Sequence, residues 1–110
     1  MNWRILKDLE GLDTWNDYSF QKPVVFFKHS IRCSISAMVK DRFERGWIYN
    51  DEDVIPVYLD LISHRDVSNR IAELYGIDHQ SPQILLIKNG KCVHTSSHSS
   101  IDPEKLSLHL

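Results

Sequence analysis

The clearest hydrophobic segment of the chain is Val24–Phe27, a continuous β-branched and aromatic run after Pro23. Such a run is typical of a strand buried on both faces of a sheet. Hydrophobic residues then recur at helical spacing, at Ile35, Met38, Val39 and Phe43. The pattern therefore predicts a strand followed directly by a helix, and Gly46 is suited to the left-handed conformation of its C-terminal cap.

Similar units stand on either side of this pair. Upstream, a short strand is expected over Trp3–Leu6, followed by a helix that ends near Tyr18. The apolar positions of that helix lie three residues apart, at Leu9, Leu12 and Trp15. Downstream, apolar positions alternate within Val54–Leu61, which predicts a strand that we expect to begin after Pro56.

The next helix is predicted by the spacing of Val67, Ile71 and Leu74, with Gly76 as its C-cap. After it, Pro82 opens a hydrophobic strand over Gln83–Lys88. The dipeptide Asn89-Gly90 favours a type I′ turn, so the chain is expected to return as a second strand over Lys91–Thr95.

The C-terminal segment completes the pattern. A serine-rich loop, Ser96–Ser100, leads to Asp102 as an N-cap and Pro103 at the first position of a last helix through Leu110. The resulting order predicts an α/β fold with a central mixed sheet covered by helices on both faces. This is the thioredoxin order, although pattern alone leaves flavodoxin-like and other α/β topologies open.

Size and charge narrow the class of protein. With 110 residues, 42% of them hydrophobic and 25% charged, residues 1–110 are expected to form a single globular domain. A net charge of −2 with interleaved signs predicts neither a nucleic-acid partner nor a membrane partner, and we expect a monomer. The chain lacks a leader-like start and an apolar run of about 20 residues, so we expect a cytoplasmic location.

The candidate chemistry lies where the buried strand stops and the next helix begins. Cys33 falls at that turn, where unpaired backbone N–H groups and the positive end of the helix dipole favour thiolate over thiol. Arg32, His29 and Lys28 would add positive potential if their side chains turn that way. The alternative interpretation is a small buried hydrophobic side chain, as for many free cysteines.

Ser36 occupies the position of the second cysteine in a Cys-x-x-Cys pair. The segment is therefore Cys-x-x-Ser, which can form a mixed disulfide but has no second thiol there to resolve it. Ser36 equally fits a helix-surface hydroxyl without a task, and His29 a solvent-facing or capping histidine rather than a base. The two cysteines and the six histidines lack metal-ligand spacing, so free thiols and no metal site are expected.

Several of these segments together resemble the YtxJ-like family of general stress proteins, also called monothiol bacilliredoxins. The matching segments are Lys28-His29-Ser30, Cys33-Ser34-Ile35-Ser36, Ser81-Pro82-Gln83 and Ser97-His98. The resemblance covers essentially the whole chain and implies a thioredoxin fold. It also implies exchange at Cys33 with mixed disulfides of bacillithiol, a small thiol that replaces glutathione in some bacteria. Ser34 departs from the proline of familiar members.

The same resemblance gives Pro82 a role. In thioredoxin-like proteins a cis proline lies beside the nucleophilic cysteine, and the residue before it offers backbone groups to the partner. Ser81 and Pro82 are therefore expected to form the other lip of the site. We assign catalysis to Cys33 and substrate binding to Ser36, Arg32, His29, Ser81 and Pro82.

Three functions remain open at this point. The first is a thiol oxidoreductase that takes small thiols from S-thiolated client proteins, with the small thiol as co-substrate and no bound cofactor. The second is a monothiol glutaredoxin-like protein that holds an iron–sulfur cluster, although the usual Gly-Phe after the cysteine is replaced by Ser34-Ile35. The third is a thioredoxin-like interaction module without activity.

Overall fold

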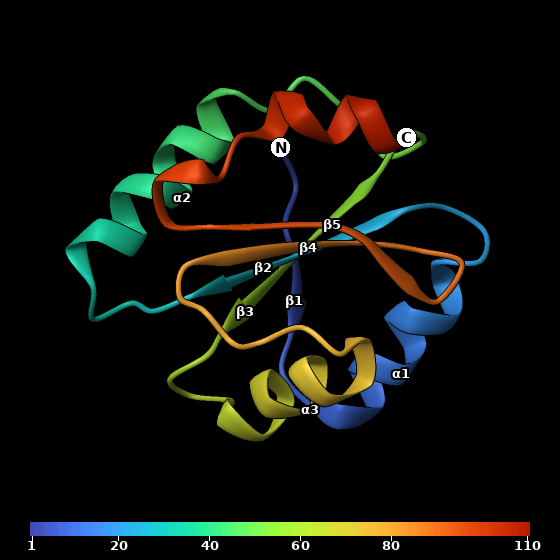
Figure 1. Cartoon of the computed structure of the whole chain (residues 1–110), viewed down its shortest axis with the longest axis horizontal. Coiled ribbons are helices and arrows are strands. Elements are labelled where there is room, and N and C mark those ends of the chain that lie inside the picture. The colour runs from blue at the N-terminus through green and yellow to red at the C-terminus, as the bar shows by residue number, and fades with distance from the viewer.

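The computed structural model describes residues 1–110 (Figure 1). In chain order the elements are β1 (Arg4–Leu6), α1 (Leu9–Tyr18), β2 (Val24–His29), α2 (Ser34–Arg45), β3 (Ile55–Asp60), α3 (Arg65–Tyr75), β4 (Gln83–Lys88) and β5 (Lys91–Ser97). Two 3₁₀ helices follow, η1 (His98–Ser100) and η2 (Pro103–His109). The five strands lie in the order β1-β3-β2-β4-β5. β1, β3 and β2 run parallel, whereas β4 is antiparallel to β2 and β5 to β4.

Two layers of helix enclose this sheet (Figure 1). α1 and α3 cover one face, where Leu12, Val67 and Ile71 pack against strand residues such as Phe26. α2 and η2 cover the other face, where Phe43 and Leu106 are among the buried residues. Because both faces are covered, the middle strands have apolar side chains on both sides, as Val24–Phe27 predicted. The predicted α/β class, with a mixed sheet between helices, is confirmed.

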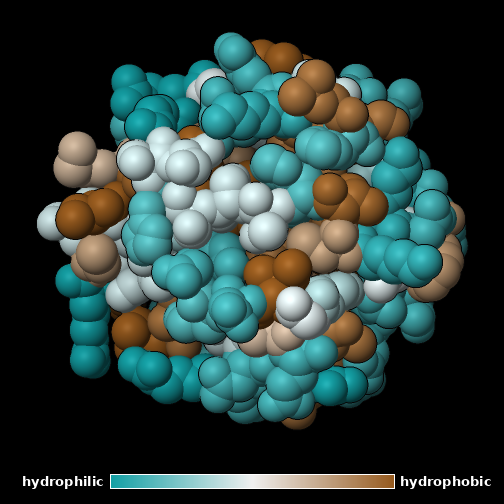
Figure 2. All heavy atoms as spheres, viewed as in Figure 1, coloured by the Kyte–Doolittle hydropathy of each residue, from teal (hydrophilic) through white to brown (hydrophobic).

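The hairpin is also confirmed. Asn89 and Gly90 both have positive φ, 54° and 74°, as a type I′ turn requires. Gly76 ends α3 in the left-handed conformation with φ 67°. None of the helices combines the length and the apolarity needed to cross a membrane. The face shown in Figure 2 is mostly hydrophilic, with scattered hydrophobic groups.

The expectation that the third strand begins after Pro56 is wrong, since β3 starts at Ile55 and includes Pro56. The Ile55 N–H donates to Pro23 O, towards β2. Successive N–H groups point to opposite sides of a strand, so Pro56 has its missing N–H on the β1 side. β1 pairs only from Arg4 opposite Val57 onward, so no ladder bond is lost there.

The expectation of a left-handed C-cap for α2 is also wrong. Gly46 caps α2 with φ −89°, outside the left-handed region. Its lack of a side chain serves a close approach instead, because a Cβ there would lie 2.9 Å from Pro103 Cγ. The predicted last helix forms as a 3₁₀ helix, and Asp102 caps it as predicted, accepting from the Glu104 N–H. Residues 96 and 97 of the predicted serine loop belong to β5.

Candidate active site

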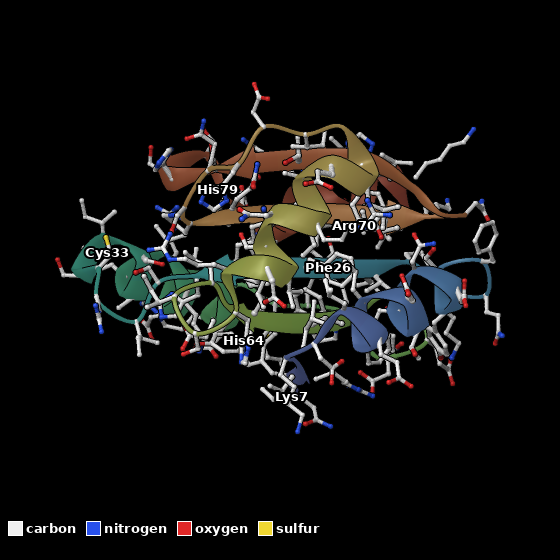
Figure 3. All side chains as sticks on the ribbon, turned by 90° about the horizontal axis from the view of Figure 1, so that it is seen from below. Lys7, Phe26, Cys33, His64, Arg70 and His79 are labelled. Atoms are coloured by element: carbon white, nitrogen blue, oxygen red, sulfur yellow. The ribbon has the colours of Figure 1, made fainter.

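Cys33 lies at the junction of β2 and α2, as the N-cap residue of α2 (Figure 3). Its backbone is extended, its N–H donates to Ser30 O at 3.2 Å, and its carbonyl accepts from Ala37 N at 3.1 Å. The half-buried thiol makes no capping hydrogen bond, and the first turn of α2 has no acidic residue. The Sγ atom is therefore free to react beside the positive end of the helix.

Ser36 and His29 lie beneath this turn. Ser36 is fully buried, and its Oγ contacts His29 Nδ1 at 2.7 Å and accepts from Ser30 N at 3.2 Å. His29 is 6% exposed, and burial, followed by the charge of Lys40, lowers its pKa. The pair thus joins the end of β2 to the first turn of α2. The structure therefore excludes the alternative of a surface hydroxyl for Ser36 and that of a solvent-facing side chain for His29.

This burial also bears on the role of the two residues. Ser36 has no exposed surface, whereas His29 keeps a small exposed fraction in a pocket that Lys40 and Tyr58 also line. Through their hydrogen bonds the two residues hold the backbone that carries Cys33, and their assignment to substrate binding stays a prediction. The direction of the bond between Ser36 Oγ and His29 Nδ1 depends on the histidine tautomer, because the hydroxyl can donate one hydrogen bond and accept a second beside that from Ser30 N–H.

The second lip comes from the start of β4. The Ser81–Pro82 peptide bond is cis, as the resemblance implied. Lys28 of β2 pairs with Gln83 of β4, which places Pro82 alongside the end of β2, where the Cys33 turn begins. Pro82 O also accepts from the His98 N–H at 3.0 Å, a backbone contact that sequence reasoning did not anticipate. Ser81 is half-buried and Arg32 is exposed.

Lys28 turns away from Cys33, so it does not add its charge to the thiol as considered above. Successive strand residues face opposite sides of a sheet, and Lys28 lies on the α3 side with no exposed surface. Its Nζ donates to Ser68 O at 3.1 Å and lies 3.3 Å from His79 Nδ1. Burial lowers the pKa of Lys28 to about 8.

The sequence analysis did not predict the cluster of Lys28, Ser68 and His79, and the loop before Ser81 depends on this cluster. Gln83 Nε2 donates to Asp78 O, and its Oε1 accepts from Gln80 N. Together with Lys28, it fixes both ends of the segment that leads to the cis proline. The sequence signal for this cluster was a lysine directly after a fully apolar strand. A lysine is rarely buried unless its ammonium group has partners.

The two cysteines occupy different parts of the fold. Cys92 pairs with Ile87 near the hairpin turn, about five residues or roughly 16 Å along the strand from Pro82. It packs against the core on the α1 and α3 face. Both thiols are free, as expected from their spacing in the sequence. A disulfide needs Cα atoms within about 7 Å, which this arrangement does not provide.

Iodoacetamide at pH 7 is expected to alkylate Cys33 about ten times faster than Cys92. Burial raises the pKa of the Cys92 thiol, which lowers its thiolate fraction, and its Sγ already contacts His94 O at 3.4 Å. Peptide mass spectrometry over a time course measures both rates in one sample. Faster labelling of Cys92 would contradict the assignment of Cys33 as the accessible thiol.

Comparison with known proteins gives a family match and structural neighbours. A family model described as monothiol bacilliredoxin BrxC matches residues 4–106. A solved structure described as a candidate oxidoreductase with a thioredoxin fold is 29% identical, with TM-score 0.78 over 96% of this chain and 91% of that chain. The thioredoxin of Malassezia sympodialis superposes with TM-score 0.75 at 17% identity, covering 98% of this chain and 87% of its own. Fasciola hepatica thioredoxin gives 0.73 at 17% identity, with 96% and 94% covered.

Proposed function

Because this chain belongs to the monothiol bacilliredoxin family BrxC, we propose that it uses Cys33 to remove bacillithiol from S-thiolated cysteines of client proteins. Family and fold together assign it to the thiol-disulfide oxidoreductases. The observation that carries the finer proposal is the pairing of a free thiol at the start of α2 with a buried hydroxyl three residues later. The domain thus supplies one nucleophile and no internal resolving thiol at that position.

The proposed reaction is a single exchange. The Cys33 thiolate attacks the bacillithiol sulfur of a client–S–S–bacillithiol disulfide, forming a Cys33–S–S–bacillithiol bond while the client sulfur leaves as a thiolate and takes up a proton. The disulfide bond thus moves from the client to Cys33, so the client cysteine is reduced to the thiol while Cys33 is oxidised to the mixed disulfide. A second molecule of the small thiol then attacks the adduct, which restores Cys33 and releases the symmetrical disulfide.

The remaining residues position the partners. Cys33, as the N-cap residue of α2, presents its sulfur at the N-terminal end of the helix, both as the attacking group and as the leaving group in regeneration. We propose that the half-buried Ser81 and the adjacent cis Pro82 guide the client backbone at the opposite lip, with Arg32 on the exposed side of the turn. The proposal also places the protein in the cytoplasm, where a reducing pool keeps thiols such as Cys33 and Cys92 free.

The test follows the adduct. Reduced protein is mixed with a bacillithiolated client, both partners are digested, and the peptide masses are measured by mass spectrometry. We expect the bacillithiol mass on the Cys33 peptide, no adduct on the Cys92 peptide, and an equal amount of reduced client. Reduced client without an adduct on Cys33, or no reduction at all, would overturn the proposal.

The Ser36→Cys protein is expected to end in a different state from the wild type. Residues three apart at a helix start share a face, so the new thiol lies within disulfide reach of Cys33. The adduct should be expelled, leaving an internal disulfide with a mass two daltons below that of the reduced protein. Ser34→Cys is the matched control, because adjacent residues do not face each other, and it should keep the adduct. An adduct that persists in Ser36→Cys would show that position 36 does not resolve it.

A further inference from the structure

An apolar surface begins beside Cys33 and continues along α2. Ile31 and Ile35 flank the cysteine in the sequence and are 61% and 60% exposed, and Met38 is 71% exposed. Single exposed hydrophobic residues are ordinary, but three large ones around a nucleophile form a patch. Figure 2 shows hydrophobic atoms gathered at the left margin, where Figure 1 places the N-terminal half of α2.

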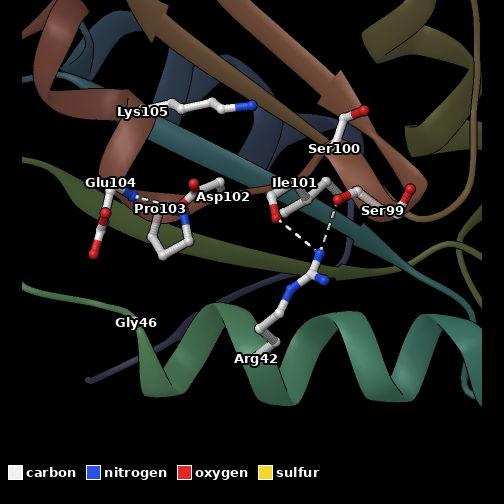
Figure 4. A pocket seen from close by; sticks show the side chains of 9 residues that line it. All are labelled: Arg42, Gly46, Ser99, Ser100, Ile101, Asp102, Pro103, Glu104 and Lys105. Carbon is white, nitrogen blue, oxygen red and sulfur yellow. Dashed lines mark hydrogen bonds between the residues drawn. The ribbon is translucent and has the colours of Figure 1, made fainter.

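The patch opens into a groove of about 490 Å³ between α2 and the segment that follows β5. Ile35, Met38 and Val39 form its apolar part, and Ser99 stands on the opposite wall. Arg42 holds this wall in place, because its Nη2 donates to Ser99 O and Ile101 O, each at 3.1 Å (Figure 4). The groove is therefore built by contacts between elements rather than by one helix alone.

The far end of the groove is basic. Positions 35, 38, 42 and 45 follow helical spacing and share one face of α2. Arg42 donates to neutral carbonyl oxygens, so its charge is not compensated there. Arg45 pairs with Asp41 at 3.0 Å, and both side chains are largely exposed. Two arginines and one aspartate leave an excess of positive charge beyond the apolar part.

We infer that this groove binds an extended client segment next to the modified cysteine, with an apolar side chain near that cysteine and an acidic side chain further along. The inference rests on the proposed function, since a client sulfur that reaches Cys33 brings its own chain over Ile31 and Ile35. Charge complementarity selects the acidic residue over a basic one.

Helix geometry sets the spacing. With a rise of about 1.5 Å per residue, Met38 lies roughly 8 Å along α2 from Cys33, and Arg42 and Arg45 lie roughly 14 and 18 Å away. An extended peptide covers about 3.3 Å per residue. The apolar side chain is therefore expected two to three residues from the client cysteine, and the acidic one four to six residues from it.

The experiment compares S-thiolated peptides that carry leucine two residues from the cysteine and either glutamate or lysine five residues from it. Each peptide is made in two versions, with these residues on the N-terminal or on the C-terminal side of the cysteine. Each kcat/KM is divided by that of the same protein on a small mixed disulfide too short for the groove. In one direction the wild type should prefer the glutamate peptide about three- to fivefold at low salt, with less preference at high salt.

Charge reversal distinguishes the groove from the rest of the surface. Arg45→Glu should reverse the preference toward the lysine peptide. Arg70→Glu on α3 is the matched control, since Arg70 is an exposed arginine with an intrahelical glutamate partner, and it should keep the wild-type preference. Equal values for both peptides in both directions, or no reversal in Arg45→Glu, would overturn the inference. If the wild-type protein did not turn over the small disulfide, that result would instead refute the proposed function.

Discussion

The Cys33→Ser protein is expected to lose de-thiolation of clients by on the order of 10³-fold or more. A serine hydroxyl does not form an anion near neutral pH, and it is a far weaker nucleophile toward a disulfide than a cysteine sulfur. No second sulfur can replace it, because Cys92 lies near the hairpin turn and packs against the opposite core. The rate of small-thiol release from a thiolated client measures the loss.

Cys92→Ser provides the control for this substitution. It removes the other thiol of the chain and should keep the rate within about twofold, since Cys92 is remote from the α2 start. Should the Cys33→Ser protein strip clients at the wild-type rate, the oxidoreductase assignment of Cys33 fails and the interaction-module alternative takes its place. Loss of activity in Cys92→Ser alone would point to a different nucleophile.

The Lys28→Met protein is expected to be more stable than the wild type at neutral pH, by up to about 3 kcal/mol. Burial lowers the pKa of Lys28 from 10.5 to about 8, and this difference measures what it costs to keep the ammonium group in the fold. Methionine has a similar length and no charge. His79 Nδ1 keeps a partner in the variant, because Ser68 Oγ also lies 3.3 Å from it.

The pH dependence gives this prediction a second readout. Below about pH 8 the lysine is protonated in both the folded and the unfolded chain, so the full cost is present. Between pH 8 and 10.5 the unfolded chain binds more protons, and the free energy of unfolding of the wild type therefore rises with pH relative to Lys28→Met. The advantage of the variant should shrink steadily across this range.

Guanidinium denaturation of both proteins at pH 7 and pH 9.5 measures the effect. Lys91→Met, at an exposed position of β5, is the control and should show no such pH-dependent gain. A Lys28→Met protein that is less stable than the wild type at pH 7 would mean that the bonds to Ser68 and His79 outweigh the cost of the buried charge.

The order of strands and helices and the position of Cys33 were predictable because they depend on local signals. The apolar run at Val24–Phe27, the Asn89-Gly90 turn and the helical repeat after Cys33 each act within a few residues. Gly46 and Pro56 were misread because their roles depend on distant partners. Pro103 approaches Gly46 from the other end of the chain, and the point where β1 begins decides whether Pro56 is tolerated.

The directions of the side chains in the site were less predictable. Lys28 and His29 extend the buried strand by two residues, although their polarity indicated its end. Their partners come from elsewhere: Ser68 and His79 follow Lys28 by 40 and 51 positions, and Ser36 belongs to the next helix. A polar residue is read as exposed until a fold supplies its hydrogen bonds, and only the tertiary structure shows them.

The start of α2 is held by Ser36 rather than by the side chain of its N-cap residue, so the reactive residue and the residue that stabilises the turn are different. Ordinarily an N-cap side chain satisfies first-turn N–H groups and contributes to the stability of its helix. Here the Sγ atom of Cys33 supports no part of the fold, while the Ser36 hydroxyl fastens the turn from below. We therefore expect the thermal unfolding midpoint to change little between the reduced protein and the protein that carries an adduct on Cys33.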